Sequence, residues 1–124
     1  MLATSEVIAF VSTTDSAGAR SFYEAALGLC VVDENAYAVV FDAHGTMLRV
    51  TAVAEVAHPG CTVLGWRVTD MSKAVSRLES LGVVFARYEG MEQDAHGVWT
   101  APNGDRIAWF TDPDGNVLSL TEFR

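Results

Sequence analysis

The strongest folding signal in the chain is VLGWRVTDMSKAVSRLESLG, from Val63 to Gly82. It begins with an apolar run typical of a β-strand, and Asp70 follows at a position that suits the N-cap of a helix. Apolar residues then recur at helical spacing, and Gly82 provides the left-handed conformation that commonly ends a helix. The segment therefore predicts a strand that leads directly into an amphipathic helix.

A similar signal lies earlier in the chain, where Val7 to Gly28 read VIAFVSTTDSAGARSFYEAALG. The capping aspartates Asp15 and Asp70, like the two terminal glycines, repeat at a spacing of about 55 residues. Turn residues separate the strand-like runs that follow each helix. The expected strands are 30–32, 37–41 and 47–53 in the first half, and 83–88, 98–101, 107–111 and 117–121 in the second. The second half has one run too many, so either 98–101 and 107–111 are the arms of one hairpin or one run is not a strand.

This duplication predicts the architecture. We expect a single α+β domain over residues 1–124, built from two βαβββ modules at about 5–54 and about 61–123. A chain of 124 residues is long enough for one core. Because a helix on one face of each sheet leaves the other face free, we expect a curved mixed sheet around a ligand-sized cavity.

Composition and charge exclude several classes of partner. The formal net charge is −8, which would repel both a nucleic-acid backbone and an anionic membrane. No apolar run approaches the roughly 18 residues of a membrane span, and the N-terminus lacks the pattern of a signal peptide. We therefore expect a cytoplasmic protein with neither nucleic-acid nor membrane partners. Cys30 and Cys61 are too few for a disulfide framework and are predicted to be buried free thiols.

Three motifs carry a resemblance to a known family. They are Phe22-Tyr23 with Leu27-Gly28, Val68-Thr69-Asp70-Met71, and Asp112-Pro113-Asp114-Gly115-Asn116. Together they resemble the vicinal oxygen chelate superfamily, which includes glyoxalase I, extradiol dioxygenases and the bleomycin- and fosfomycin-resistance proteins. The resemblance covers nearly the whole chain and implies the two-module fold, a small-molecule ligand and, by analogy, a homodimer.

The resemblance also implies metal ligands, typically a His on the first strand of a module and a Glu on the last. The two histidine positions, counted back from the capping aspartates, hold Ile8 and Val63. The two glutamate positions, counted forward from the turn glycines, hold Arg49 and Ser119. None of them can ligate a divalent metal in the manner of the family. The histidines lie in or beside turns, without a spacing that would aim two of them at one ion: His44, His58 and His96. We therefore expect no metal site and no cofactor.

Arg49 is the clearest candidate for ligand binding. On an inward-facing position of an otherwise apolar cavity, its guanidinium needs a partner. That partner is either a carboxylate, phosphate or enolate oxygen of a ligand, or an acidic residue in an internal ion pair. A strand register different from the expected one would instead turn Arg49 outward. Ser119 occupies the equivalent position of the second module but has no evident base beside it.

Further candidates lie in and beside the loop 89–97, which we expect either at the mouth of the cavity or as an ordinary surface loop. Tyr88, Gln93, Asp94 and His96 offer hydrogen bonds and acid–base groups there. Trp99 is a candidate wall that stacks on a planar ligand, although core packing is an equal alternative. By strand alternation Trp66 should point under a helix, and Trp109 is undecided.

The leading hypothesis is a metal-independent small-molecule-binding protein of glyoxalase/bleomycin-resistance type, with a ligand that is anionic and planar. One alternative is an enzyme of the same superfamily, a lyase, isomerase or dioxygenase with relocated metal ligands. A second is a metal-free acid–base enzyme that uses His96 or Asp94. A third is a structural or partner-binding module whose own side chains fill the cavity.

Overall fold

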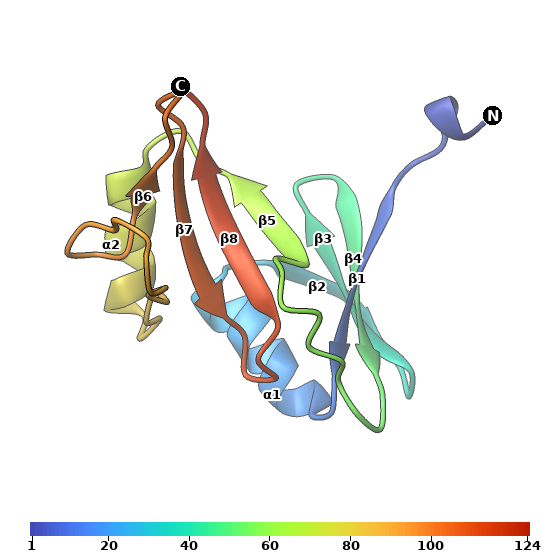
Figure 1. Ribbon diagram of the computed structural model, residues 1–124. Coiled ribbons are helices and arrows are strands. Elements are labelled where there is room, and N and C mark those ends of the chain that lie inside the picture. The colour runs from blue at the N-terminus through green and yellow to red at the C-terminus, as the bar shows by residue number, and fades with distance from the viewer. The chain divides into compact units, whose positions relative to one another are not determined.

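The computed structural model describes all residues, 1–124. The chain forms two compact units, Met1–His58 and Pro59–Arg124, and each contains one four-stranded mixed sheet (Figure 1). Apart from short helical turns, each unit runs strand, helix, strand, strand, strand. The predicted α+β class and the two βαβββ modules are therefore confirmed. No helix is long and apolar enough to cross a membrane.

The first unit contains a short 3-10 turn, a helix with a π-helical extension, and four strands. Its elements are η1 (Leu2–Thr4), β1 (Ile8–Thr13), α1 (Ser16–Ser21), η2 (Phe22–Ala26), β2 (Cys30–Glu34), β3 (Ala38–Ala43) and β4 (Thr46–Ala52). The strand order is β1-β4-β3-β2, with β1 parallel to β4 and the other pairs antiparallel. The expected N-cap is present, because the side chain of Asp15 accepts a hydrogen bond from the N–H of Gly18 at 3.1 Å.

The core of the first unit lies between this sheet and its helix. Apolar side chains of β1, β3 and β4 that share one face of the sheet are buried: Val11, Val39, Phe41, Leu48 and Val50. Tyr23 of η2 packs on them, with its ring centroid 5.8 Å from that of Phe41. The opposite side is called here the helix-free face of the first sheet.

The second unit repeats this plan with a longer helix. Its elements are β5 (Leu64–Arg67), α2 (Met71–Ser80), β6 (Trp99–Thr100), β7 (Arg106–Thr111) and β8 (Val117–Glu122). The strand order is β5-β8-β7-β6, with β5 parallel to β8. Figure 1 shows α2 along one side of this sheet, where Met71, Val75 and Leu78 are buried. Asp70 caps α2 by accepting a hydrogen bond from the N–H of Lys73 at 3.0 Å.

Two expectations from the sequence are wrong. Residues 83–88 do not form a strand, because a single backbone hydrogen bond, from Ala86 N–H to the Trp109 carbonyl at 2.7 Å, ties them to β7. The second unit therefore has three strands after its helix, as the repeat requires, and not the four runs seen in the sequence. Strands β6 and β7 pair as a hairpin. The two cysteines are free but exposed, since Cys30 begins the edge strand β2 and Cys61 lies in the connection before β5.

Candidate functional site

Arg49 lies in the middle of β4, on the helix-free face of the first sheet. Its register partners are Phe10 on β1 and Val40 on β3, whereas its chain neighbours Leu48 and Val50 point into the core. The side chain is half-buried, and no hydrogen bond or ion pair engages its guanidinium. The internal ion pair that the sequence left open is therefore not formed.

Apolar side chains surround Arg49 on the same face. Ile8, Phe10 and Met47 share this side of the sheet and remain substantially exposed, Phe10 at 61%. Ile8 thus lies on the face where the resemblance had implied a metal ligand. Phe10 is a candidate site residue that was not predicted from the sequence, although strand alternation from Ile8 was a sufficient signal to find it.

An aromatic cluster covers part of the second sheet. The ring of Tyr88 meets that of Trp109 edge-on, with centroids 5.5 Å apart, and the Trp99 and Trp109 centroids are 6.3 Å apart. Trp109 pairs with Ser119 and alternates with the buried Ala108 and Phe110, so the cluster lies on the side away from α2. The structure therefore brings two predicted residues, Tyr88 and Trp99, together through Trp109, whose orientation the sequence had left undecided.

Ser119 shares this side of the second sheet but is only 7% exposed. It pairs with Gly65 of β5, and a Cβ placed on Gly65 would stand 2.6 Å from its hydroxyl oxygen. The hydroxyl therefore fills the space that a side chain at position 65 would take. Its contribution to ligand binding stays a prediction.

Gln93 holds the loop before β6 together. Its Oε1 accepts a hydrogen bond from the N–H of Tyr88 at 2.8 Å, and its Nε2 donates to the carbonyls of Ala86 at 2.9 Å and Gly97 at 2.8 Å. These three bonds position Tyr88, which belongs to the aromatic cluster. Direct contact of Gln93 with a ligand stays a prediction.

Asp94 and His96 lie beside α2, in a different place from the aromatic cluster. His96 Nδ1 is 3.1 Å from Oε1 of Glu79 on α2, and the three side chains help to line a small pocket of about 180 Å³ that also includes Arg106. A carboxylate at one ring nitrogen can orient an imidazole for proton transfer at the other. A role for Asp94 and His96 at the mouth of a ligand cavity remains a prediction.

The carboxylate of Asp94 is occupied by the loop backbone. Its Oδ1 accepts hydrogen bonds from the N–H groups of His96 at 2.8 Å and Val98 at 3.0 Å. Partial burial acts to raise the pKa of Asp94, but the hydrogen bonds from Val98 and His96 outweigh it and the pKa is lowered. An ionised carboxylate held in this way is a poor general base, so of the two residues His96 is better suited to proton transfer.

Comparison with known families decides where this chain belongs. A family model described as the Glyoxalase/Bleomycin resistance protein/Dioxygenase superfamily matches residues 7–120, which is nearly the whole chain. The chain belongs to this superfamily. No curated protein matches it.

Solved structures share the fold of this glyoxalase-superfamily chain. Lactoylglutathione lyase from Agrobacterium tumefaciens is 18% identical with a TM-score of 0.68, and the match covers 95% of this chain and 93% of that chain. A glyoxalase/bleomycin resistance protein/dioxygenase from Alicyclobacillus acidocaldarius is 16% identical with a TM-score of 0.71, covering 97% and 92%. A superfamily member from Sphaerobacter thermophilus is 24% identical with a TM-score of 0.69, covering 94% and 97%. At these identities the likeness shows the fold alone.

The side chains of this glyoxalase-superfamily chain do not fit the metal that the resemblance implies. The implied ligand positions hold Ile8 and Arg49 in the first unit and Val63 and Ser119 in the second. Ile8 and Val63 are aliphatic, Arg49 is cationic, and Ser119 carries a neutral hydroxyl. Aliphatic groups offer no lone pair, and a guanidinium repels a cation. No three His, Cys, Asp or Glu side chains are grouped so that they could hold a metal ion.

Proposed function

We propose that this glyoxalase-superfamily chain binds a small, planar, anionic organic molecule without the help of a metal ion. The observation that carries the proposal is Arg49, a half-buried guanidinium on the helix-free face of the first sheet that has no partner of its own. The homodimer and the cytoplasmic location expected from the sequence stay predictions.

The energetics of Arg49 support an anionic ligand. A charge that is partly removed from water loses solvation, and a carboxylate, sulfonate or phosphate that binds it restores that loss. Arginine presents a rigid fork of donors that matches a carboxylate in a bidentate arrangement, and such charge-assisted bonds are stronger than neutral ones. The alternative is that Arg49 covers the apolar sheet with its methylene stem while water solvates its head.

The preference for a planar ligand rests on the aromatic side chains of the two units. Phe10 lies beside Arg49 in the register of the first sheet and is 61% exposed. Tyr88, Trp99 and Trp109 form the cluster on the second sheet, on the side away from α2. Flat rings stack or meet edge-on with other flat rings, so both surfaces suit an aromatic or conjugated body.

The test is a binding screen of aromatic carboxylates, sulfonates and phosphates, each paired with a neutral amide or alcohol of the same shape. Binding is followed by calorimetry and NMR titration in wild type, in Arg49→Met, and in Arg77→Met as a control on the exposed surface of α2. We expect saturable binding of anions by wild type and Arg77→Met, and affinity lower by about tenfold or more in Arg49→Met. The absence of saturable binding by any anion, or equal binding by Arg49→Met, would reject the proposal.

A further inference from the structure

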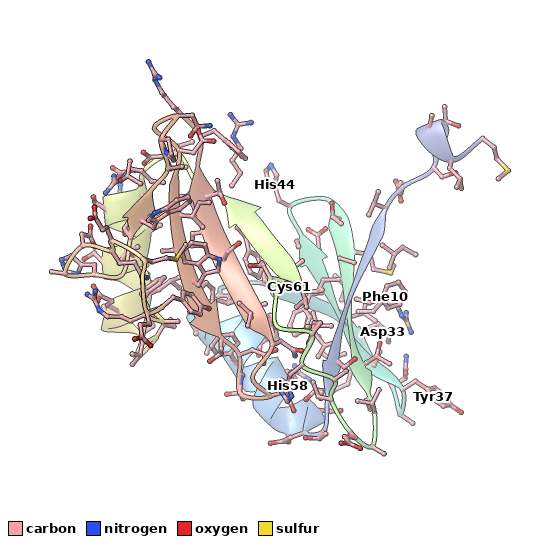
Figure 2. The ribbon with its side chains drawn as sticks, in the orientation of Figure 1. Phe10, Asp33, Tyr37, His44, His58 and Cys61 are labelled. Atoms are coloured by element: carbon pink, nitrogen blue, oxygen red, sulfur yellow. The ribbon has the colours of Figure 1, made fainter.

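A row of four residues crosses the helix-free face of the first sheet. The register pairs Asp33 of β2 with Val40 of β3, Val40 with Arg49 of β4, and Arg49 with Phe10 of β1. The buried, apolar Val40 lies between the acidic and the basic side chain. Figure 2 shows Asp33 and Phe10, at the two ends of the row, projecting from the same side of the sheet.

A β-bulge decides which way Asp33 points. Val31 pairs with Phe41 and Asp33 with the next residue, Val40, so Val32 is an extra residue that reverses the alternation of β2. The neighbouring side chain confirms the reversal, because Glu34 reaches Arg20 of α1 on the helix side of the sheet. Asp33 therefore shares a face with Arg49 rather than with the core.

Asp33 and Arg49 have opposite charges but do not form an ion pair. They lie two strand spacings apart, which places their Cα atoms about 10 Å from each other. Asp42 adds a second negative charge on the same face. It lies on β3 two residues from Val40, the register partner of both Asp33 and Arg49, and its Oδ1 accepts a hydrogen bond from the N–H of Gly45 at 3.0 Å. Within the row, the acidic Asp33 and the basic Arg49 thus flank the apolar Val40.

We propose that the ligand of this face is zwitterionic, with a carboxylate or similar anion held by Arg49 and an ammonium or similar cation held by Asp33. This inference rests on the proposed function, to which it adds the second charge of the ligand. A rigid planar body of about one aromatic ring would span the buried Val40 between the two charged side chains. Two opposite charges at a set separation also fix the direction in which the ligand lies.

The experiment compares two probes of nearly the same shape. In 4-(aminomethyl)benzoate a carboxylate and an ammonium stand at opposite ends of a ring, and 4-ethylbenzoate replaces the ammonium by a methyl group. Both are titrated by NMR into wild type, Asp33→Asn, Arg49→Met and Glu34→Gln. The last is the matched control, since it removes one negative charge from the adjacent position of β2 on the opposite face.

We expect wild type and Glu34→Gln to bind 4-(aminomethyl)benzoate about two- to fivefold more tightly than 4-ethylbenzoate, the range that one solvent-accessible ion pair contributes. Asp33→Asn should remove this preference while it still binds 4-ethylbenzoate, and Arg49→Met should weaken both probes. Equal binding of the two probes by wild type, or an unchanged preference in Asp33→Asn, overturns the zwitterion inference and leaves the proposed function standing. If no anion in the wider screen binds, the proposed function fails and this inference fails with it.

Discussion

Asp94 shows how a single carboxylate orders a loop, and its effect depends on pH. Partial burial works to raise the pKa of Asp94, but the N–H groups of Val98 and His96 lower it overall. The unfolded chain therefore binds a proton more readily than the folded one does. The stabilisation from Asp94 is complete above its ordinary pKa of about 4, and it is lost as the pH falls through the lower folded value.

The variant Asp94→Asn tests this effect, because it keeps the shape of the side chain and removes its charge. At pH 7 we expect a loss of about 1 kcal/mol or less in the free energy of unfolding, since solvent screens this exposed group. The difference from wild type should shrink as the pH falls below about 4. Urea unfolding at several pH values measures it, with Glu92→Gln in the same loop as the control. A constant difference from pH 7 to pH 3 would contradict the explanation.

Strand alternation in the sequence predicted the orientation of Arg49 but not that of Asp33. Arg49 follows the simple alternation of a strand, so counting residues placed it on the side away from the core. Asp33 follows a bulge, and strict alternation along β2 would have assigned it to the opposite face. A bulge depends on how two strands pair, and no local signal in 30–34 announces it.

The elements themselves show where local signals suffice. Asp15 and Asp70 were both predicted as helix caps, and both accept the expected backbone hydrogen bond. Capping is local, because donor and acceptor lie three residues apart in the chain. The extended segment 83–88 begins with a continuous apolar run and therefore satisfies the sequence pattern of a strand, whereas a strand also requires a hydrogen-bonded neighbour.

Close packing between β5 and β8 gives a second prediction. Gly65→Ala would place a Cβ 2.6 Å from the hydroxyl oxygen of Ser119 and 3.3 Å from its carbonyl oxygen. We expect Gly65→Ala to lower the free energy of unfolding by about 1–3 kcal/mol, as other overpacking substitutions do.

Ser119→Ala removes the nearer of these two atoms and should partly rescue the Gly65→Ala variant. Thermal or urea unfolding of wild type, both single variants and the double variant measures the coupling between the two positions. We expect the double variant to be more stable than the sum of the single effects predicts. Strict additivity would show that the two side chains do not compete for the same space.

The protein as a whole should be stable and bind its ligand without a metal ion. Dialysis against EDTA is expected to leave the Tm and the binding of aromatic carboxylates unchanged, because the four implied ligand positions hold Ile8, Arg49, Val63 and Ser119. Elemental analysis of protein purified without a chelator provides the second measurement. Stoichiometric zinc, nickel, manganese or iron, or a fall in Tm after chelation, would favour a superfamily enzyme with relocated ligands.

The α+β class, the duplicated βαβββ modules and the superfamily could all be predicted from the sequence alone. These follow from helical and strand periodicity, from capping aspartates and from turn glycines, all of which act between residues close together in the chain. Three relationships became visible in the folded chain and not in the sequence: Tyr88 and Trp99 meet through Trp109, Asp94 and His96 lie beside α2, and Asp33 shares a face with Arg49. Each of them depends on strand register and on packing between distant segments, which local preferences do not specify.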